Sequence, residues 1–327
     1  MDKLDVALLR ELIQGGQSLV PFSQDIRQPY GPISDRLGVS EVTVRNRIAE
    51  IEKSGVIEGW SVALNPELIG LKLCRVRIAL APDSNLSRHR DEIDKIKLVE
   101  GVLELSEYFG GAIKIHIYYD TDEALKRRLE LISKIAGSDD VICSRVRLPK
   151  PLSTRISEAD LKILFELQGN PRRMLKSIAE DARVSTKTVA RALYKLSNDG
   201  DVFLIPKFNP RALEGAVLAD LLVTYSNPSA KADTDSKIMS VFGESMVVRK
   251  EISDPQCSYF QMILSNISST ADIQSLARQN PGVKSATLDL VQECFRNYEI
   301  IAEQISSQLG SRSEAFNHAV SKGVTAA

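Results

Sequence analysis

The amino-acid sequence contains the same pattern twice, with the copies about 150 residues apart, and this repeat is the strongest constraint on the fold. The segment DVALLREL at residues 5–12 matches DLKILFEL at residues 160–167. The segment VSEVTVRNRIAEIEKSGVI at residues 39–57 matches VSTKTVARALYKLSNDGDV at residues 184–202, and an Asn-Pro pair follows each copy. Because order and spacing are both preserved, we predict two structurally equivalent halves.

The two copies differ in one loop. The first copy has an insertion around GGQSLVPFSQDIRQPYG, residues 15–31, where glycines, prolines and polar residues favour turns. A linker between the halves is predicted at Pro149–Arg155, because the two prolines of PKPLSTR discourage regular structure.

Each copy begins with a pattern typical of three helices followed by a wing or hinge strand. In the third helix of the first copy, Val44, Ile48 and Ile51 recur at helical spacing and define a buried face. Ser40 is placed to cap the start of this helix, and Gly55 to end it in a left-handed turn. The corresponding residues of the second copy are Ser185, Val189, Leu193, Leu196 and Gly200.

Beyond each Asn-Pro pair the pattern becomes β-α-β-β-α-β. Such a unit folds as a four-stranded antiparallel sheet with two helices on one face. The bare face of that sheet needs a partner, and the other half of the chain can supply it. The expected strands are 71–81, 102–109, 112–119 and 141–148 in the first half, and 217–225, 245–251, 258–264 and 283–291 in the second; the first-half helices are expected at 86–96 and 122–135.

We therefore predict an α+β chain with two winged helix-turn-helix domains, each followed by a ferredoxin-like β-α-β-β-α-β domain. The predicted boundaries are 1–65 and 66–150 for the first pair of domains, and 151–210 and 211–293 for the second. Residues 294–327 are predicted to hold a C-terminal helix and a tail, since ECFRNYEIIAEQISSQL is amphipathic and ends at Leu309.

Composition argues against several other classes of protein. With 43% hydrophobic and 26% charged residues, the chain has the make-up of a soluble globular protein. Its four cysteines form no CxxC pair and its three histidines are far apart, so we expect no metal site and no cofactor. No nucleophile–base constellation, P-loop or Rossmann fingerprint occurs, so we do not expect an enzyme. Without a secretion signal or an apolar stretch near the ~20 residues of a membrane span, a cytoplasmic location away from the membrane is expected.

In these segments the chain resembles the leucine-responsive regulator (Lrp)/AsnC family of bacteria and archaea. The residues with this resemblance are LDVALLREL, ISDRLGVSEVTVRNRIAEIEKSGVI and WSVALNPELIGL in the first half, and ADLKILFEL with IAEDARVSTKTVARALYKLSNDGDV in the second. The resemblance implies a sequence-specific transcription regulator that binds double-stranded DNA, dimerises by packing its sheets face to face, and often forms larger assemblies.

Two features depart from the family pattern. Family members mostly have one unit per chain, so the duplication suggests an intramolecular pseudo-dimer. Family sensors of amino acids typically have a Gly-x-Tyr-Asp-like turn, whereas this chain has FGGAIKI and SDPQCSYFQ at the corresponding places. A small-molecule effector therefore stays an open question, as does the size of any homo-oligomer.

A recognition helix lies in the major groove with its N-terminal residues facing the base edges. With the apolar face inward, Thr43, Asn46 and Arg47 point outward; we expect Arg47 to reach guanine, Asn46 adenine, and Ser40 and Thr43 phosphate. The residues expected at the DNA are Ser40, Thr43, Arg45, Asn46 and Arg47 in the first copy, and Thr186, Lys187, Thr188, Arg191 and Lys195 in the second. The alternative is an ordinary solvated helix face.

The two copies differ in charge, although the formal net charge of the chain is only −1. Residues 1–58 contain seven basic and nine acidic residues, whereas residues 153–207 contain ten basic and seven acidic residues. Because phosphate contacts dominate DNA affinity, we expect the second copy to bind DNA more strongly.

Alternation along the predicted strands puts charges on the bare sheet faces. If Val76, Ile78 and Leu80 face the helices, Arg75 and Arg77 face the other way, and Arg145 and Arg147 were assigned to the same side. Aligning the copies places Asp220 at the Arg75 position and Asp289 at the Arg147 position. We therefore predict an inter-sheet interface with Arg75 and Arg147 set against Asp220 and Asp289.

Several alternatives remain open at this stage. For the sheet faces, one alternative is that the charged residues are exposed and unrelated. Another is that Lys114, His116 and Tyr118 form a pocket for an anionic effector. A second alternative for the whole chain is a siroheme-decarboxylase-like tetrapyrrole enzyme, since that group shares this architecture and the LIQGGQSLVPF segment is similar to its first loop. The third alternative is an architectural protein that organises DNA without an effector.

Overall fold

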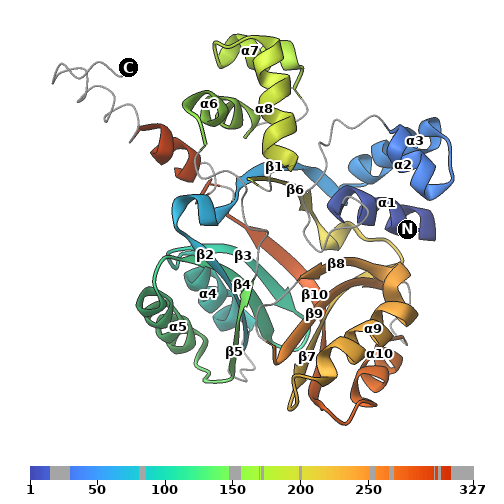
Figure 1. The fold of residues 1–327 in the computed structure, drawn as a ribbon. Coiled ribbons are helices and arrows are strands. Elements are labelled where there is room, and N and C mark those ends of the chain that lie inside the picture. The colour runs from blue at the N-terminus through green and yellow to red at the C-terminus, as the bar shows by residue number, and fades with distance from the viewer. Residues whose placement is uncertain are drawn as a thin grey trace.

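The computed structural model describes residues 1–14, 30–80, 86–146, 156–168, 170, 173–198, 201–250, 255–264, 269–297, 299–300 and 303–310. Two groups of helices lie beside an eight-stranded sheet whose two four-stranded halves are turned toward each other, and each half has a pair of helices on its outer side (Figure 1). Residues 15–29 of the predicted insertion, the predicted linker Pro149–Arg155 and Arg147 lie outside the described residues.

The two halves contain helices and strands in the same order. In the first half these are α1 (Lys3–Gln14), α2 (Gly31–Leu37), α3 (Glu41–Lys53), β1 (Ile57–Leu64), η1 (Pro66–Ile69), β2 (Lys72–Ala79), α4 (Leu86–Lys97), β3 (Val102–Tyr108), β4 (Ala112–Tyr119), α5 (Asp122–Ala136) and β5 (Val141–Val146). In the second half they are α6 (Glu158–Leu167), α7 (Leu175–Asp181), α8 (Thr186–Asn198), β6 (Val202–Phe208), η2 (Pro210–Ala212), β7 (Val217–Tyr225), α9 (Ala230–Phe242), η3 (Gly243–Ser245), β8 (Met246–Lys250), β9 (Cys257–Leu264), α10 (Ser269–Arg278) and β10 (Val283–Arg296).

Helices α1–α3 form one helical unit, here called HTH1, and α6–α8 form a second, HTH2. The predicted caps are confirmed: the Ser40 hydroxyl accepts a hydrogen bond from the Thr43 amide at 3.1 Å, and the Ser185 hydroxyl accepts one from Thr188 at 3.1 Å. Gly55 has a φ of 77°, a left-handed conformation that glycine adopts without steric cost, and α3 ends just before it.

The strands that follow the two helical units pair with each other. β1 and β6 form a separate antiparallel two-stranded sheet. A hydrogen bond closes each end of it: the Asn65 backbone amide donates to the Asp201 carbonyl at 2.8 Å, and the Asn209 backbone amide donates to the Val56 carbonyl at 3.0 Å. The pairing exchanges side chains: Val62 and Leu64 of β1 are buried in the core of HTH2, and Phe208 of β6 packs against the core of HTH1. The hinge strands therefore hold the two helical units together.

The remaining strands form one sheet of eight in the order β5-β2-β4-β3-β10-β7-β9-β8. β5-β2-β4-β3 and β10-β7-β9-β8 correspond to the two predicted four-stranded sheets, and β3 joins them by pairing with the last residues of β10. The prediction of a helix over the whole C-terminal run was wrong at its start, because Glu293 to Arg296 continue β10 and pair with Glu104 to Glu107. Residues 303–310 are helical, and Ile305 is buried in the HTH2 core.

Each sheet buries its apolar residues against its own helices and turns polar residues toward the other sheet. Val76 and Ile78 lie in the core beneath α4 and α5, as the alternation predicted, and Leu221 and Phe260 lie in the core beneath α9 and α10. The space between the sheets contains buried charged residues, Arg75, Lys114 and Asp220 among them. This polar seam between the sheets is described with the candidate site below.

Candidate nucleic-acid interface

Helix α8 presents a basic surface at the exposed side of HTH2. The predicted residues Thr186, Lys187, Arg191 and Lys195 are all exposed, and Thr188 is half-buried. The Ser185 and Thr188 hydroxyls hydrogen-bond to each other at 2.8 Å while Ser185 caps the helix. The cap fixes the start of α8 and leaves its cationic side chains directed to solvent.

The cations of α8 form no ion pair within the part of the chain that the structure describes. The helix sequence TKTVARALYKLSN contains no acidic residue, so nothing on α8 itself neutralises Lys187, Arg191 or Lys195. Sequence analysis missed Tyr194, whose side chain is 75% exposed between Arg191 and Lys195. Its signal was present, because a large aromatic residue on the polar face of an amphipathic helix has no place in the core.

Helix α3 occupies the corresponding position in HTH1, and its side chains are engaged differently. The Ser40 and Thr43 hydroxyls lie 2.8 Å apart at the helix start, in the same arrangement as on α8. Arg45 is exposed, with its guanidinium 5.5 Å from the centre of the Tyr30 ring, and Asn46 is exposed. Of the residues predicted at the DNA in this copy, Ser40, Arg45 and Asn46 are therefore exposed, and Thr43 and Arg47 are half-buried.

Arg47 departs from the prediction that it points outward to reach guanine. Its guanidinium instead bridges back to α1, 2.9 Å from the Asp2 carboxylate and 3.2 Å from the Asp5 carboxylate. Asp2 and Asp5 already cap α1 reciprocally, each carboxylate accepting the other residue's backbone amide at 2.9–3.0 Å. The backbone hydrogen bond from Asp5, aided by the charge of Arg47, holds the pKa of Asp2 below its usual value. Arg47 thus serves the packing of α3 on α1.

A second charged constellation lies in the polar seam between the sheets. Arg77 of β2 forms a two-pronged ion pair with Asp289 of β10, with Nε and a terminal nitrogen 2.7 and 2.9 Å from the two carboxylate oxygens. Lys114 of β4 contacts Asp220 of β7 at 2.8 Å, and neither side chain is exposed by more than 1%. Both pairs link the first half of the chain to the second.

Asp220 is the centre of this seam. Its carboxylate accepts hydrogen bonds from the Lys114 ammonium at 2.8 Å, the Tyr108 hydroxyl at 2.6 Å and the Gln261 amide at 2.9 Å. Burial by itself raises the pKa of Asp220, but the charges of Lys114 and Arg75 and these hydrogen bonds outweigh it, so the pKa is lowered to about 2. The carboxylate is therefore ionised at neutral pH although it is buried.

The predicted interface residues are placed as follows. Arg75 stacks on Tyr259 of the opposite sheet, 3.4 Å from the ring centre, rather than pairing directly with a carboxylate. Arg145 was assigned to the wrong face: it pairs with Asp122 at the start of α5 on the helix side, because one residue of error in strand parity reverses every side chain. Arg147 lies outside the described residues. The position equivalent to Asp289 in the first half is Ser144 rather than Arg147. Asp289 stands opposite Asp220 in its sheet, and Ser144 stands opposite Arg75, the equivalent of Asp220.

Lys114 and His116 do not form the anion pocket that one alternative placed there. The Lys114 ammonium lies 3.6 Å from Glu104 as well as 2.8 Å from Asp220, and the His116 ring lies 3.4 Å from Glu104. Glu104 also accepts a hydrogen bond from Arg296 at 3.0 Å. Lys114 and His116 therefore lie beside carboxylates of the protein itself.

Comparison with known proteins places this architecture. A family model described as winged helix-turn-helix DNA-binding matches residues 156–200, which include α6–α8. The HTH-type transcriptional regulator LrpA of Pyrococcus horikoshii is 34% identical over 84 residues, 26% of this chain and 57% of LrpA. Ptr1 of Methanocaldococcus jannaschii is 27% identical over 40% of this chain and 82% of its own length, and AsnC of Haemophilus influenzae is 24% identical over 43% and 90%. These relatives are regulators of the Lrp/AsnC family, to which the chain is similar in sequence.

The chain spans 57% of the length of LrpA, little more than half of that relative. Over its whole length it is similar in fold to a structure described as the siroheme decarboxylase NirDL. The TM-score is 0.54 at 14% identity, covering 94% of this chain and 100% of the other. At that identity the similarity concerns the fold alone.

Proposed function

We propose that this chain is a sequence-specific, DNA-binding transcription regulator of Lrp/AsnC type, formed by tandem duplication, in which HTH2 supplies most of the DNA affinity. The observation that carries the proposal is the surface of α8, where Lys187, Arg191 and Lys195 are exposed and unopposed by any acidic residue of the helix. Phosphate contacts from such cations supply the sequence-independent part of DNA affinity. The residues proposed at base edges and phosphates are those named from the sequence, with Arg47 moved to a structural role and Tyr194 added.

HTH1 is proposed to act chiefly as a structural support for HTH2, with little DNA affinity of its own. Its recognition helix α3 contains three basic and three acidic residues, and one of the basic residues, Arg47, is held by α1. HTH1 is also anchored to the second half, because the N-terminal ammonium donates to the Glu214 carbonyl at 2.8 Å and Arg10 to the Gly243 carbonyl at 3.3 Å. These contacts support a head that orients the molecule and binds DNA weakly.

The test is a DNA titration by fluorescence anisotropy with matched double variants. We expect R191A/K195A to weaken binding much more than R45A/R47A, and to lower the slope of log affinity against log salt by about 2, one for each phosphate contact. K162A on α6, where Lys162 pairs with Glu158 at 2.7 Å, is the control for loss of a basic side chain of HTH2 outside α8, and it leaves the affinity unchanged. Equal losses for the two double variants would contradict the assignment to HTH2.

Footprinting across the genome separates regulation from DNA architecture. A regulator protects discrete operators, and their spacing reports how the two heads are used. Uniform coverage without preferred sites supports the architectural alternative instead. No effector is assigned in this proposal.

The decarboxylase alternative is tested directly. The similar fold is that of a protein described as a siroheme decarboxylase, and that chemistry needs a tetrapyrrole pocket. In this chain the polar seam is filled by its own side chains, with Lys114 and His116 both contacting Glu104. We expect no change in the absorption spectrum of siroheme on addition of the protein, and no release of carbon dioxide; either signal would favour the enzyme.

Two further points concern where and with what the protein works. Within the ranges that the structure describes, no helix is long and apolar enough to cross a membrane. We propose a cytoplasmic regulator whose first partner is its own second half, with the two sheets paired inside one chain. Assembly into larger homo-oligomers, which is typical of the family, is left to size measurements in solution.

A further inference from the structure

Two cysteines of neighbouring strands lie with their thiols in contact. Cys74 of β2 and Cys143 of β5 have their sulfur atoms 2.7 Å apart. In the register of these strands Cys143 stands opposite Val76, two positions from Cys74, so both side chains are on the helix-facing side of the sheet. The sulfurs are less than about 1 Å beyond the ~2.05 Å length of a disulfide bond.

The two thiols differ in their surroundings. Cys74 is completely buried and also donates toward the Ser144 carbonyl at 3.3 Å, while Cys143 is exposed on β5, the outer strand of the sheet. The hydrogen bond between the two thiols, together with burial, raises the pKa of Cys74. Cys74 is therefore a protonated thiol while Cys143 is reduced, and it loses its proton only in the step that would form a disulfide.

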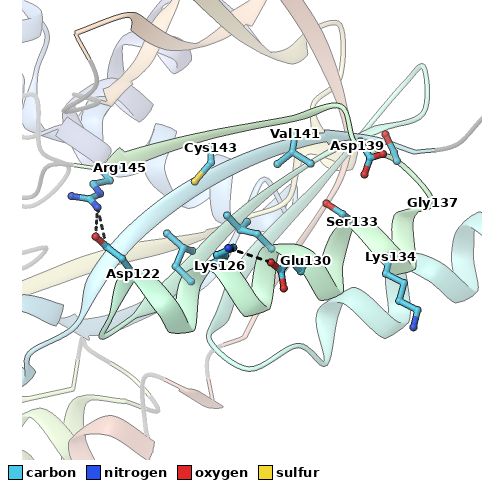
Figure 2. Close-up of a pocket in the computed structure, with 13 residues that line it drawn as sticks. Asp122, Lys126, Glu130, Ser133, Lys134, Gly137, Asp139, Val141, Cys143 and Arg145 are labelled. Carbon is cyan, nitrogen blue, oxygen red and sulfur yellow. Dashed lines mark hydrogen bonds and ion pairs between the residues drawn. The ribbon is translucent and has the colours of Figure 1, made fainter.

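Cys143 lines an open groove between β5 and α5, of about 860 Å³ (Figure 2). Three basic and three acidic side chains line this groove, and Arg145 pairs there with Asp122 and Lys126 with Glu130. A small oxidant has free access to Cys143 from this side. The thiolate is the form of a cysteine that reacts with a peroxide.

We propose that Cys74 and Cys143 form a reversible dithiol–disulfide pair that responds to hydroperoxides, with Cys143 as the attacking thiol and Cys74 as the resolving thiol. The thiolate sulfur of Cys143 attacks one peroxide oxygen, the O–O bond breaks, and the leaving hydroxide or alkoxide takes a proton. Cys143 is then a sulfenic acid. The Cys74 sulfur attacks the Cys143 sulfur, the S–O bond breaks, and water leaves with the Cys74 proton. The two thiols lose two electrons in total, and the peroxide gains them.

The structure explains why the pair closes within the chain. The resolving thiol is already in contact with the attacking one, so the second step needs no encounter with another molecule. The disulfide ties the outer strand β5 to β2 at the place where the chain leaves the first sheet toward HTH2. In a reducing compartment such a bond is transient and is reversed by thiols.

The test uses the purified full-length protein with hydrogen peroxide, followed by alkylation and mass spectrometry. We expect a loss of about 2 Da, two fewer alkylated cysteines, and a Cys74–Cys143 linked peptide that dithiothreitol removes. C257S and C294S are the matched controls and behave as the wild type. C143S abolishes the loss, and C74S leaves a Cys143 sulfenic acid that dimedone traps.

Two results would overturn the proposal. One is that all four cysteines remain open to alkylation after oxidation. The other is that Cys143 links two chains, seen as a dimer on a non-reducing gel, in place of the bond to Cys74. Because the wild-type protein gives the decisive peptide, the result does not depend on how well the variants fold. It is also independent of DNA binding.

Discussion

Removing the charge of Asp220 tests whether the polar seam holds the two halves together. In the variant D220N the amide keeps the shape of the side chain, and its oxygen still accepts hydrogen bonds from Tyr108 and Lys114. What is lost is the negative charge beside a lysine that is fully buried, and with it the acceptor oxygen for the Gln261 side chain. Breaking a buried ion pair from one side costs about 3–5 kcal/mol, because the remaining charge has no compensation.

The magnitude follows from the surroundings of Lys114. Glu104 lies 3.6 Å from the ammonium and compensates part of its charge, so we expect the lower end of that range, about 3 kcal/mol. With an unfolding entropy of about 2.1 cal/mol/K per residue, a chain of 327 residues that unfolds as one unit then loses about 4 °C in melting temperature. Calorimetry and urea unfolding followed by circular dichroism measure both quantities.

The double variant K114M/D220N separates the ion pair from simple packing. Replacing both charges removes the uncompensated lysine, so we expect the double variant to be more stable than D220N alone. D122N, which breaks the exposed pair with Arg145, is the surface control and leaves the melting temperature unchanged. If the effects of K114M and D220N simply add, the seam is not held by this pair and the reasoning is refuted.

The seam and the helix caps give two further predictions. Because the pKa of Asp220 is lowered to about 2 from an ordinary 3.8, its contribution is complete above about pH 4 and is lost as the pH falls toward 2. The stability difference between wild type and D220N, measured by urea unfolding, should therefore shrink by about 2 kcal/mol over that window; a difference that stays constant would contradict it. S40A and S185A should each cost about 1 kcal/mol, since the two caps have the same geometry, and unequal losses would mean that one helix start is held by other contacts.

The helices and strands could be predicted from the sequence almost throughout, because their signals are local. The strand expected at 112–119 is β4, Ala112–Tyr119, and the strand expected at 217–225 is β7, Val217–Tyr225. The exception is the end of β10, where Cys294 to Arg296 were predicted as helix. Those residues become strand only because β3, nearly two hundred residues earlier, offers an edge, and no window of local sequence contains that edge.

The candidate site was less predictable, because it depends on contacts between elements. Helical geometry placed Arg47 outward, but the capping carboxylates of Asp2 and Asp5 stand close enough to draw it back. Lys114 was a candidate for an anion pocket, and Asp220 was predicted at the inter-sheet interface, but the ion pair between the two was not predicted. Predicting the pair of Lys114 and Asp220 requires the relative placement of two strands from different halves of the chain, and the hydrophobic pattern of the sequence does not determine it.

The charges of the polar seam bear on why one chain holds both halves. The first-half sheet contributes Arg75, Arg77 and Lys114 to it, while the second-half sheet contributes Asp220 and Asp289. Two copies of the first-half sheet would bring the cations together and leave Glu104 as their counter-charge, whereas unlike sheets match them. Covalent linkage raises the effective concentration of the unlike partner to about the millimolar range or above. Because only the unlike sheet halves match these charges, the pairing of the first half of the chain with the second is favoured over pairing of two first halves.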